Sequence, residues 1–221
     1  PVRVAIEPEK AVVDEVTQIL YHVGQHEKFN LLLGLMKQEA GEKVLIFCNT
    51  KIEAEQLEWK LNHNGFNAGQ ISGDLHQRAR IKVLEKFQEG ELDILIATDV
   101  ASRGLHIDNI THVINYDLPQ DAEDYVHRIG RTARAGNKGT AITLCCEDFA
   151  QHLDRVEDYL KDKIPVAWPE EGLFLEEKEG KPPPRKRRGP PKAKPDNRRP
   201  HTGRPPRRRP PSRGRELART R

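Results

Sequence analysis

The chain has 221 residues, with 37 Lys and Arg against 34 Asp and Glu and a formal net charge of +3. No window of 18 apolar residues occurs, and the first residues show no charged segment followed by an apolar one. We therefore expect neither a membrane-spanning helix nor a secretory signal. Cys48, Cys145 and Cys146 lack metal or redox spacing, and we interpret them as reduced, buried thiols of a cytoplasmic protein.

Residues 1–14 are interpreted as a linker from a preceding domain, and residues 15–176 as one folded domain. Six short apolar or β-rich runs predict strands at 15–23, 43–48, 67–72, 93–98, 112–117 and 139–146. Four longer amphipathic segments predict helices at 26–41, 50–65, 76–90 and 147–162. Thr50 is a predicted N-cap, and Gly41 and Gly65 are predicted helix ends.

This alternation of strands and helices predicts an α/β fold, a parallel sheet with helices on both faces. Ligands of such folds sit beyond the carboxyl ends of the strands. Polar clusters follow four predicted strands, at residues 49–51, 72–74, 98–106 and 116–119. We therefore expect the functional site at that edge of the sheet.

The last part of the chain, residues 177–221, is predicted to be a disordered basic tail. From Lys181 onward it carries 17 Lys and Arg against two acids, and it holds 11 of the 16 prolines. The rest of the chain is acidic, so the tail is interpreted as a polyanion-binding segment, with RNA or DNA as the expected partner. A tail that only increases solubility is the alternative.

The segment HRIGRTARAG places Arg128, Arg131 and Arg134 at every third position. On a helix these side chains would share one face and form a cationic ridge. Like charges at this spacing repel, and guanidinium groups match phosphate oxygens, so the pattern indicates a triphosphate site. A solvated basic helix face is the alternative.

The strand end at Thr98 and Asp99 is followed by small residues and by Arg103 and Gly104, a pattern that permits close backbone approach to a phosphate. An ordinary loop in which Arg103 pairs with Asp99 is the alternative. In SGDLHQRAR (72–80), two polar side chains lie three positions apart on the next predicted helix. They could contact a phosphate backbone or simply face solvent.

Several common catalytic motifs are missing from the sequence. It has no G-x-x-x-x-G-K-[ST] phosphate loop, no acidic cluster after an apolar strand to hold Mg²⁺, and no zinc-binding spacing. We therefore predict no metal ligands in this chain. Phosphate-binding arginines without a phosphate loop indicate half of an active site.

Four segments, VLIFCNTK, SGDLHQRAR, ATDVASRGLHI and HRIGRTARAG, occur in this order. Together they resemble the C-terminal RecA-like domain of DEAD-box RNA helicases over about residues 15–170. The segments RGLHI and IPVAWPEE and the basic tail are most similar to bacterial members of the RNA degradosome. The resemblance implies a RecA-like fold and an ATP-dependent helicase that unwinds RNA in RNA degradation, with a degradosome endoribonuclease as the expected partner.

The resemblance also implies roles for individual residues. Arg131 and Arg134 match catalytic arginine fingers that reach ATP bound, with Mg²⁺, on a separate N-terminal RecA-like domain. The residues that match interdomain coupling positions are Asp99, Arg103, His127 and Arg128. Those that match RNA-binding positions are Gly73, Gln77, Arg80 and Thr98. Gly104 and His106 match ATP-binding positions, and His106 stands where most of the family has an Asp that contacts the ribose.

Two other functions remain open from the sequence. The domain could belong to a helicase that acts on DNA, or it could be a docking or RNA-binding module without catalysis. We expect the isolated chain to hydrolyse no ATP, because the phosphate loop is predicted in the N-terminal domain.

Overall fold

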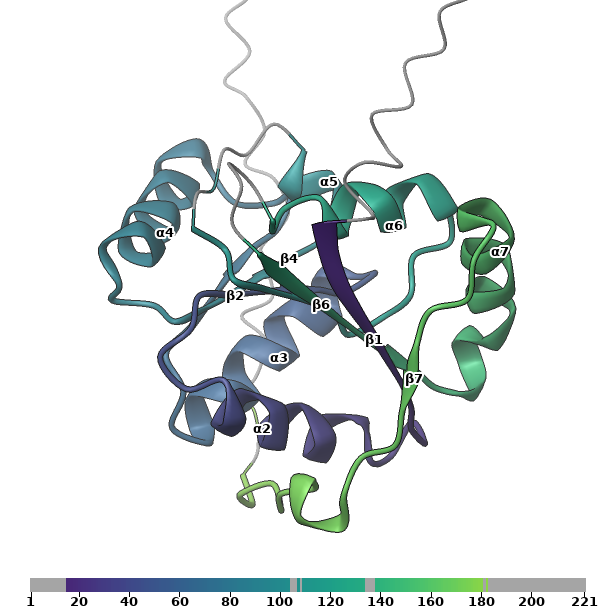
Figure 1. The fold of residues 1–221 in the computed structure, drawn as a ribbon. Helices are drawn as coiled ribbons and strands as arrows, with labels where there is room; N and C mark the ends of the chain where they lie inside the picture. The colour runs from purple at the N-terminus through teal and green to yellow at the C-terminus, as the bar shows by residue number, and fades with distance from the viewer. Residues whose placement is uncertain (1–14, 104–106, 108, 134–137, 181, 183–221) are drawn as a thin grey trace, which may run out of the picture. The chain divides into compact units, whose positions relative to one another are not determined.

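The computed structural model describes residues 15–103, 107, 109–133, 138–180 and 182. Its centre is a seven-stranded sheet in the order β3-β4-β2-β5-β6-β1-β7, in which neighbouring strands run parallel (Figure 1). The strands are β1 (Val16–His22), β2 (Val44–Phe47), β3 (Ala68–Ile71), β4 (Ile94–Ala97), β5 (His112–Asn115), β6 (Gly139–Cys145) and β7 (Val166–Ala167). The six predicted strands are therefore confirmed, and β7 is an additional edge strand.

The helices alternate with these strands along the chain. They are α2 (Lys28–Gln38), α3 (Lys51–His63), α4 (Gln77–Glu89), α5 (Asp99–Ser102), α6 (Ala122–Ile129) and α7 (Ala150–Leu160), with 3-10 turns η1 (Glu147–Phe149) and η2 (Glu171–Leu173). The four long predicted helices are present. The last begins as η1, and the helices α5 and α6 were not among those predicted.

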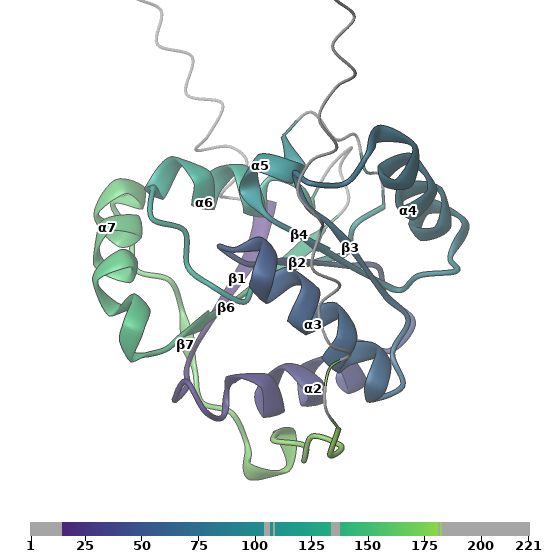
Figure 2. The same ribbon diagram turned by 180° about the vertical axis from the view of Figure 1, so that it is seen from behind.

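Both faces of the sheet are covered, as β2 shows residue by residue. Val44 and Ile46 pack with α2 and α3, whereas Leu45 and Phe47 pack on the opposite face in the cluster that includes residues of α4 and α5. Residues of α6 and α7 form a further cluster with β1 and β6. Figures 1 and 2 show these helices on the two sides of the sheet. The alternation follows the two-residue period of a strand, and the predicted α/β class is confirmed.

Local sequence sets the ends of several helices. The Thr50 hydroxyl accepts a hydrogen bond from the Glu53 N–H at 3.1 Å, which confirms the predicted N-cap of α3. Gly90 ends α4 in the left-handed conformation, with φ of 81°, where a side chain would be strained. Because α3 follows β2, its start at Thr50 lies beside the carboxyl edge of the sheet, and its end lies away from that edge.

The edge strand β3 is bonded to side chains of α3. Asn62 donates from Nδ2 to the Ala68 carbonyl at 2.8 Å and accepts the Ala68 N–H through Oδ1 at 3.1 Å. The Glu58 carboxylate accepts the Gln70 N–H at 3.2 Å. Burial raises the pKa of the Glu58 carboxyl, although the hydrogen bond from Gln70 opposes the shift.

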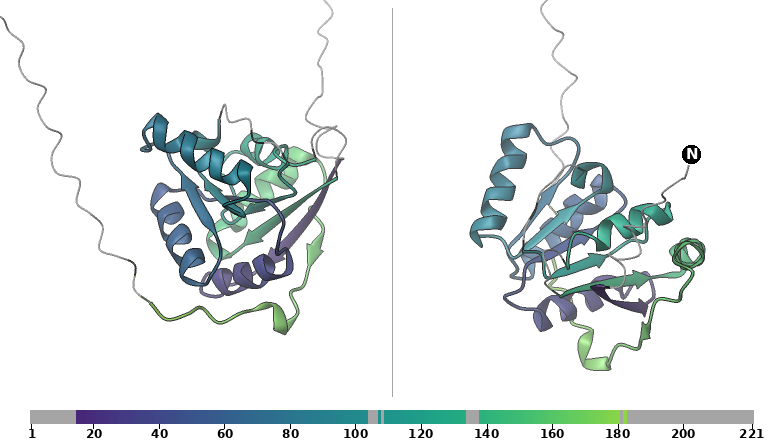
Figure 3. Two further views of the ribbon diagram at one scale, coloured as in Figure 1. Left: turned by 90° about the vertical axis from the view of Figure 1, so that its left-hand side faces the viewer. Right: turned by 45° about the horizontal axis from the view of Figure 1, so that its top comes forward.

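The chain after β7 returns along α2 and α3 (Figure 3). The Leu175 N–H donates to the Asn30 carbonyl, and Glu177 pairs with Lys60 at 2.9 Å. Gly34 permits this close approach, since a Cβ atom there would lie 1.7 Å from the Leu173 carbonyl oxygen. The bond from the Lys178 N–H to Asn64 continues the contact, so these tail residues lie with the folded unit. The rest of the predicted tail, from 183 onward, is outside the described residues.

Two predictions from composition can be compared with the structure. Among the described residues, no helix is long and apolar enough to cross a membrane. Cys48, Cys145 and Cys146 are free and buried, which confirms the interpretation of buried thiols.

Candidate functional site

Because the strands are parallel, their carboxyl ends meet at one edge of the sheet. The side chains of Asn49, Asp99 and Asp117 follow β2, β4 and β5 there, and Asn115 is the last residue of β5. These three strands are neighbours in the sheet. The predicted location of the polar clusters is therefore confirmed, and the structure shows what joins them.

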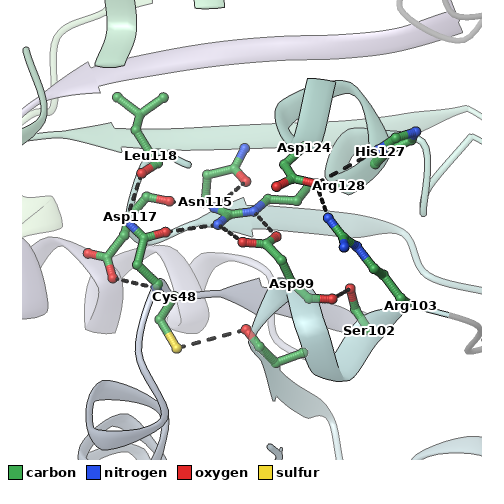
Figure 4. A network of polar contacts seen from close by, with 12 residues as sticks. Cys48, Asp99, Ser102, Arg103, Asn115, Asp117, Leu118, Asp124, His127 and Arg128 are labelled. Carbon is green, nitrogen blue, oxygen red and sulfur yellow. Dashed lines mark hydrogen bonds and ion pairs between the residues drawn. The ribbon is translucent and has the colours of Figure 1, made fainter. Parts of the chain in front are cut away.

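One arginine joins all three strand ends (Figure 4). Arg128, from α6, binds the Asp99 carboxylate through two nitrogens, with Nε–Oδ1 of 2.6 Å and Nη2–Oδ2 of 2.7 Å. It also donates to Asn49 Oδ1 at 2.9 Å and to the Asp117 carbonyl at 2.6 Å. Its guanidinium lies over the Phe47 ring, and the residue is only 1% exposed. Arg128 is thus a buried, bidentate clamp inside the domain.

A second buried ion pair lies beside this clamp. Lys28 Nζ, on the first residue of α2, is 2.7 Å from Asp117 Oδ1, and the lysine is fully buried. The ammonium also lies over the rings of Tyr116 and Phe149. Asp117 Oδ2 accepts the Asn49 N–H at 3.0 Å. Lys28 and Arg128 are therefore connected through Asp117 and Asn49, and together the contacts fix the loops after β2 and β5.

The predicted cationic ridge on one helix is wrong. The helix α6 ends at Ile129 and Gly130 is its C-cap, so Arg131 lies outside it. Arg128 points into the protein, because it lies on the same buried face of α6 as Tyr125 and Ile129. The buried Thr132 hydroxyl donates to the Ile110 carbonyl at 2.7 Å, which holds the chain against the loop before β5. Arg134 lies outside the described residues.

A second arginine pair connects α5 and α6 at the surface. Arg103 Nη2 donates to Asp124 Oδ1 at 3.0 Å, and the arginine side chain is 69% exposed. The alternative in which Arg103 pairs with Asp99 is wrong, because Asp99 is already occupied by Arg128. His127 Nδ1 is 3.9 Å from Asp124 Oδ1, one turn along the same helix.

These side chains border a small cleft of about 220 Å³, lined by Asp99, Ser102, Arg103, Asp124, His127, Arg128 and Arg131. The structure therefore brings together the described coupling candidates and the catalytic candidate Arg131. The ATP-binding candidates Gly104 and His106 lie outside the described residues.

The RNA-binding candidates lie on the neighbouring part of the edge. Arg80, on α4, donates from Nη2 to the Ala101 carbonyl of α5, so it contacts the same short helix that ends at the cleft. Gln77 is the first residue of α4 and is exposed. A Cβ atom at Gly73 would meet nothing within 4 Å, so the backbone there is open. Thr98 is buried, and its carbonyl accepts the Ala101 and Ser102 N–H groups that begin α5.

Three buried groups near this edge, the thiols of Cys48 and Cys145 and the hydroxyl of Tyr116, do not provide a nucleophile. Burial raises the pKa of the Cys48 thiol well above its usual range, and nearby Asp117 adds to the shift. Burial likewise raises the pKa of the Cys145 thiol to about 11. It also raises the pKa of the Tyr116 hydroxyl well above its usual range. These groups stay protonated and inert at neutral pH. In the described part of the chain, no three His, Cys, Asp or Glu side chains are grouped to hold a metal ion.

Sequence reasoning missed several partners at this edge. The clusters at 49–51 and 116–119 were identified, but not the bonds of Asn49 and Asp117 to Arg128. Lys28 was missed, although it precedes an apolar helical run and shares a face with Leu31, Leu32 and Leu35. Such a lysine inside an apolar pattern is a signal for a buried ion pair. Asp124 was also missed, since acids in the first turn of a helix are common.

Three comparisons identify similar proteins. The family described as "Helicase conserved C-terminal domain" matches residues 27–136. The ATP-dependent RNA helicase RhlB of Shewanella sp. (strain ANA-3) is 46% identical over 177 residues, which is 80% of this chain and 40% of that protein. The chain thus spans about two fifths of the length of the curated relatives it matches.

Solved structures give the same result. The Escherichia coli DEAD-box protein SrmB, bound to regulator of ribonuclease activity A, matches with a TM-score of 0.67 and 32% identity, over 76% of this chain and 98% of that chain. Saccharomyces cerevisiae Dbp5, bound to RNA and ADP BeF3, matches with a TM-score of 0.66 and 32% identity, over 70% of this chain and 42% of that chain.

Together with these matches, the parallel sheet and its arginine-lined carboxyl edge define the protein as a RecA-like helicase domain. More particularly, the chain belongs to the DEAD-box family and corresponds to its C-terminal helicase domain.

Proposed function

We propose that this chain is the C-terminal half of an ATP-dependent RNA helicase that unwinds RNA duplexes. The observation that carries the proposal is the cleft in which Arg131 lies with Asp99, Arg103, His127 and Arg128. The chain has arginines for a triphosphate and no phosphate loop of its own. The names of the relatives support the same activity, since RhlB is an ATP-dependent RNA helicase.

In the proposed mechanism, ATP binds to an N-terminal RecA-like domain that faces this cleft. Closure brings Arg131, and Arg134 beyond the described residues, to the transferred phosphate, where a guanidinium stabilises the charge of the transition state. Mg²⁺ would be held by the other domain. The nearest carboxylates here, Asp99 and Asp124, are bonded to arginines and do not form a ligand set.

RNA would bind along the part of the edge formed by Gly73, Gln77, Arg80 and Thr98. The open backbone at Gly73 and the exposed first turn of α4 suit contacts to phosphate and sugar. Such contacts read the backbone rather than the bases, so recognition would depend on the 2′-hydroxyl and strand shape. The bond from Arg80 to α5 gives a direct route from this surface to the ATP cleft.

The finer parts of the proposal follow from the similarity to RhlB. The helicase would act in RNA degradation in the cytoplasm, with a degradosome endoribonuclease as its partner. Gly104 and His106 would lie near the ATP ribose, His106 with a weaker hold than the Asp of other members. The basic tail would add nonspecific affinity for RNA.

The test is ATP hydrolysis by residues 1–221 alone and by the same chain joined to its N-terminal domain. The isolated chain should be inactive, and the two-domain protein should hydrolyse ATP when RNA is added. Arg131→Ala should lower kcat by about 10³-fold or more. Arg155→Ala, an exposed arginine of α7, is the matched control and should have little effect. An active isolated chain, or equal activity of the two variants, would contradict the proposal.

The alternatives, a DNA helicase and a docking or RNA-binding module, can be distinguished by adding RNA or DNA to the hydrolysis assay. A DNA helicase would be stimulated as well by DNA as by RNA, and a docking module would bind RNA without any stimulated hydrolysis. Deletion of residues 181–221 should weaken RNA binding and flatten its dependence on salt, because fewer counterions are released. An unchanged salt slope would leave the tail a solubilising segment only.

A further inference from the structure

Two ion pairs connect α5 and α6, and they have a common pattern. On each side an acid is followed four positions later by an arginine: Asp99, the first residue of α5, by its C-cap Arg103, and Asp124 by Arg128 within α6. Residues at this spacing on one helix could pair with each other. The pairs cross between the helices instead, Asp99 with Arg128 and Arg103 with Asp124.

The crossed arrangement gives the two arginines different freedom. Arg128 is buried and bound by several groups besides Asp99, so it has no room to change partners. Arg103 is largely exposed, and within the described part of the chain its ion pair is with Asp124. An exposed pair of this kind is held weakly and can be exchanged for another partner.

Asp124 also has a particular position in the cleft. Among the described lining residues, Arg103, His127 and Arg131 bring basic side chains to it, while the other acid, Asp99, is bonded to Arg128. Asp124 lies 3.0 Å from Arg103 and 3.9 Å from His127, so its carboxylate stands between two of these side chains. Removal of its charge would leave Arg103 without this ion pair.

We infer that Asp124 is a positioning residue that holds Arg103 and His127 at the cleft in the orientation needed for coupling between RNA binding and ATP hydrolysis. The inference rests on the proposed function. In this role Asp124 needs no contact of its own with ATP or RNA. It acts through Arg103, whose guanidinium would otherwise adopt many rotamers before closure.

The test compares three variants in the two-domain protein. Asp124→Asn keeps the size and removes the charge, Asp124→Glu keeps the charge, and Glu123→Gln is the matched control on the exposed face of α6. Asp124→Asn should lower the RNA-stimulated kcat about 5-fold or more, with little change in the apparent KM for ATP. Asp124→Glu should recover part of the loss, and Glu123→Gln should match the unmodified protein.

A double-mutant cycle tests whether the effect passes through Arg103. In an Arg103→Gln background, Asp124→Asn should produce little further loss. The 15N chemical shift of Arg103 Nε in residues 1–221 provides a second readout, which Asp124→Asn should move and Glu123→Gln should not. Equal free energies of unfolding for the variants would show that the effect is not a loss of folding.

The outcomes also separate this inference from the proposed function. If the unmodified two-domain protein shows no RNA-stimulated hydrolysis, the proposed function fails. If it is active and Asp124→Asn behaves like Glu123→Gln, or if the two losses are additive in the cycle, the positioning role is overturned.

Discussion

Two Asp–Arg ion pairs join the α5 region to α6: the inner pair, Asp99–Arg128, and the outer pair, Arg103–Asp124. They are made from the same residue types but differ in their surroundings. In the Asp99–Arg128 pair the arginine is buried and bonds to three strand ends, although the Asp99 side chain is 23% exposed, whereas Arg103–Asp124 lies at the surface of the cleft. Burial decides the difference. A desolvated ion pair needs a partner for each of its hydrogen-bond donors and acceptors, and it then fixes the fold around it. A solvated ion pair can be broken at a small cost in free energy.

The inner pair is stable only because its polar groups are satisfied. Asn49 and the Asp117 carbonyl receive the arginine nitrogens that Asp99 does not. Removing Arg128 leaves the half-buried Asp99 carboxylate without its cation and two further acceptors, on Asn49 and Asp117, without their donor, which is more costly than losing the pair as a whole. Substitutions at the two pairs and around them should therefore differ in size in a fixed order.

The largest effect is expected for Arg128→Met. The variant leaves the Asp99 carboxylate without its bidentate partner and frees the loops after β2 and β5. We expect a loss of about 3–5 kcal/mol in the free energy of unfolding, measured by urea denaturation. Arg155→Met on exposed α7 is the control. A loss as small as that of the control would mean that the clamp contributes nothing to folding.

Lys28→Met should have the next largest effect. Methionine fills the same space but leaves Asp117 with only the Asn49 N–H and no cation. The expected loss is about 3 kcal/mol, measured in the same urea experiment. Lys37→Met, in the last turn of the same helix and exposed, provides the control. If Lys28→Met were as stable as the unmodified protein, the buried pair would be replaceable by apolar packing.

Arg103→Met, at the outer pair, should hardly change stability. An exposed ion pair contributes at most about 1 kcal/mol and is screened by salt. The difference between this variant and the unmodified protein should shrink further in 1 M NaCl. A loss comparable to that of Arg128→Met would remove the distinction between the two pairs.

The smallest effect on stability is expected for the half-buried Glu58 of α3, where burial acts on a single carboxylate rather than on an ion pair. Its pKa is raised in the folded state, mainly by burial, so the folded protein binds the proton more tightly than the unfolded chain does. Its contribution to stability is full below the unfolded pKa of about 4.5 and is lost as pH rises through the folded value.

Glu58→Gln removes this titration and keeps an oxygen acceptor for Gln70. Relative to the unmodified protein, the variant should become more stable as pH rises from 4 to 7, by less than about 0.5 kcal/mol. Urea midpoints at several pH values would measure it, with the exposed Glu85→Gln as control. A parallel pH dependence in the two variants would contradict the shift.

The elements of the fold could largely be predicted because their patterns are local. The continuous apolar runs of β2 and β4 indicate strands covered on both faces, and Thr50 marks the start of α3. The two-residue strand β7 and the four-residue helix α5 are too short to leave a periodic pattern. The strand order also lies beyond local pattern, since it depends on which faces the crossing helices cover.

The location of the candidate site could be predicted from the sequence, but not which acid forms an ion pair with which arginine. The sequence places Asp99, Arg103 and Arg128 at strand and helix ends, and the resemblance assigns them roles. Whether Asp99 pairs with Arg103 or with Arg128 depends on where α6 packs. The same packing turns Arg128 away from Arg131, which spacing alone had placed on one face. Asp124 and Lys28 required the structure, because their partners are distant in sequence.

The bonds from α3 to β3 have a consequence for association between molecules. An edge strand with unpaired N–H and C=O groups can template strands from other chains and lead to aggregation. At β3, the Ala68 backbone groups and the Gln70 N–H are already bonded to Asn62 and Glu58. Side chains of the helix thus occupy three backbone groups that an added strand would need, which opposes growth of the sheet into fibrils from this edge.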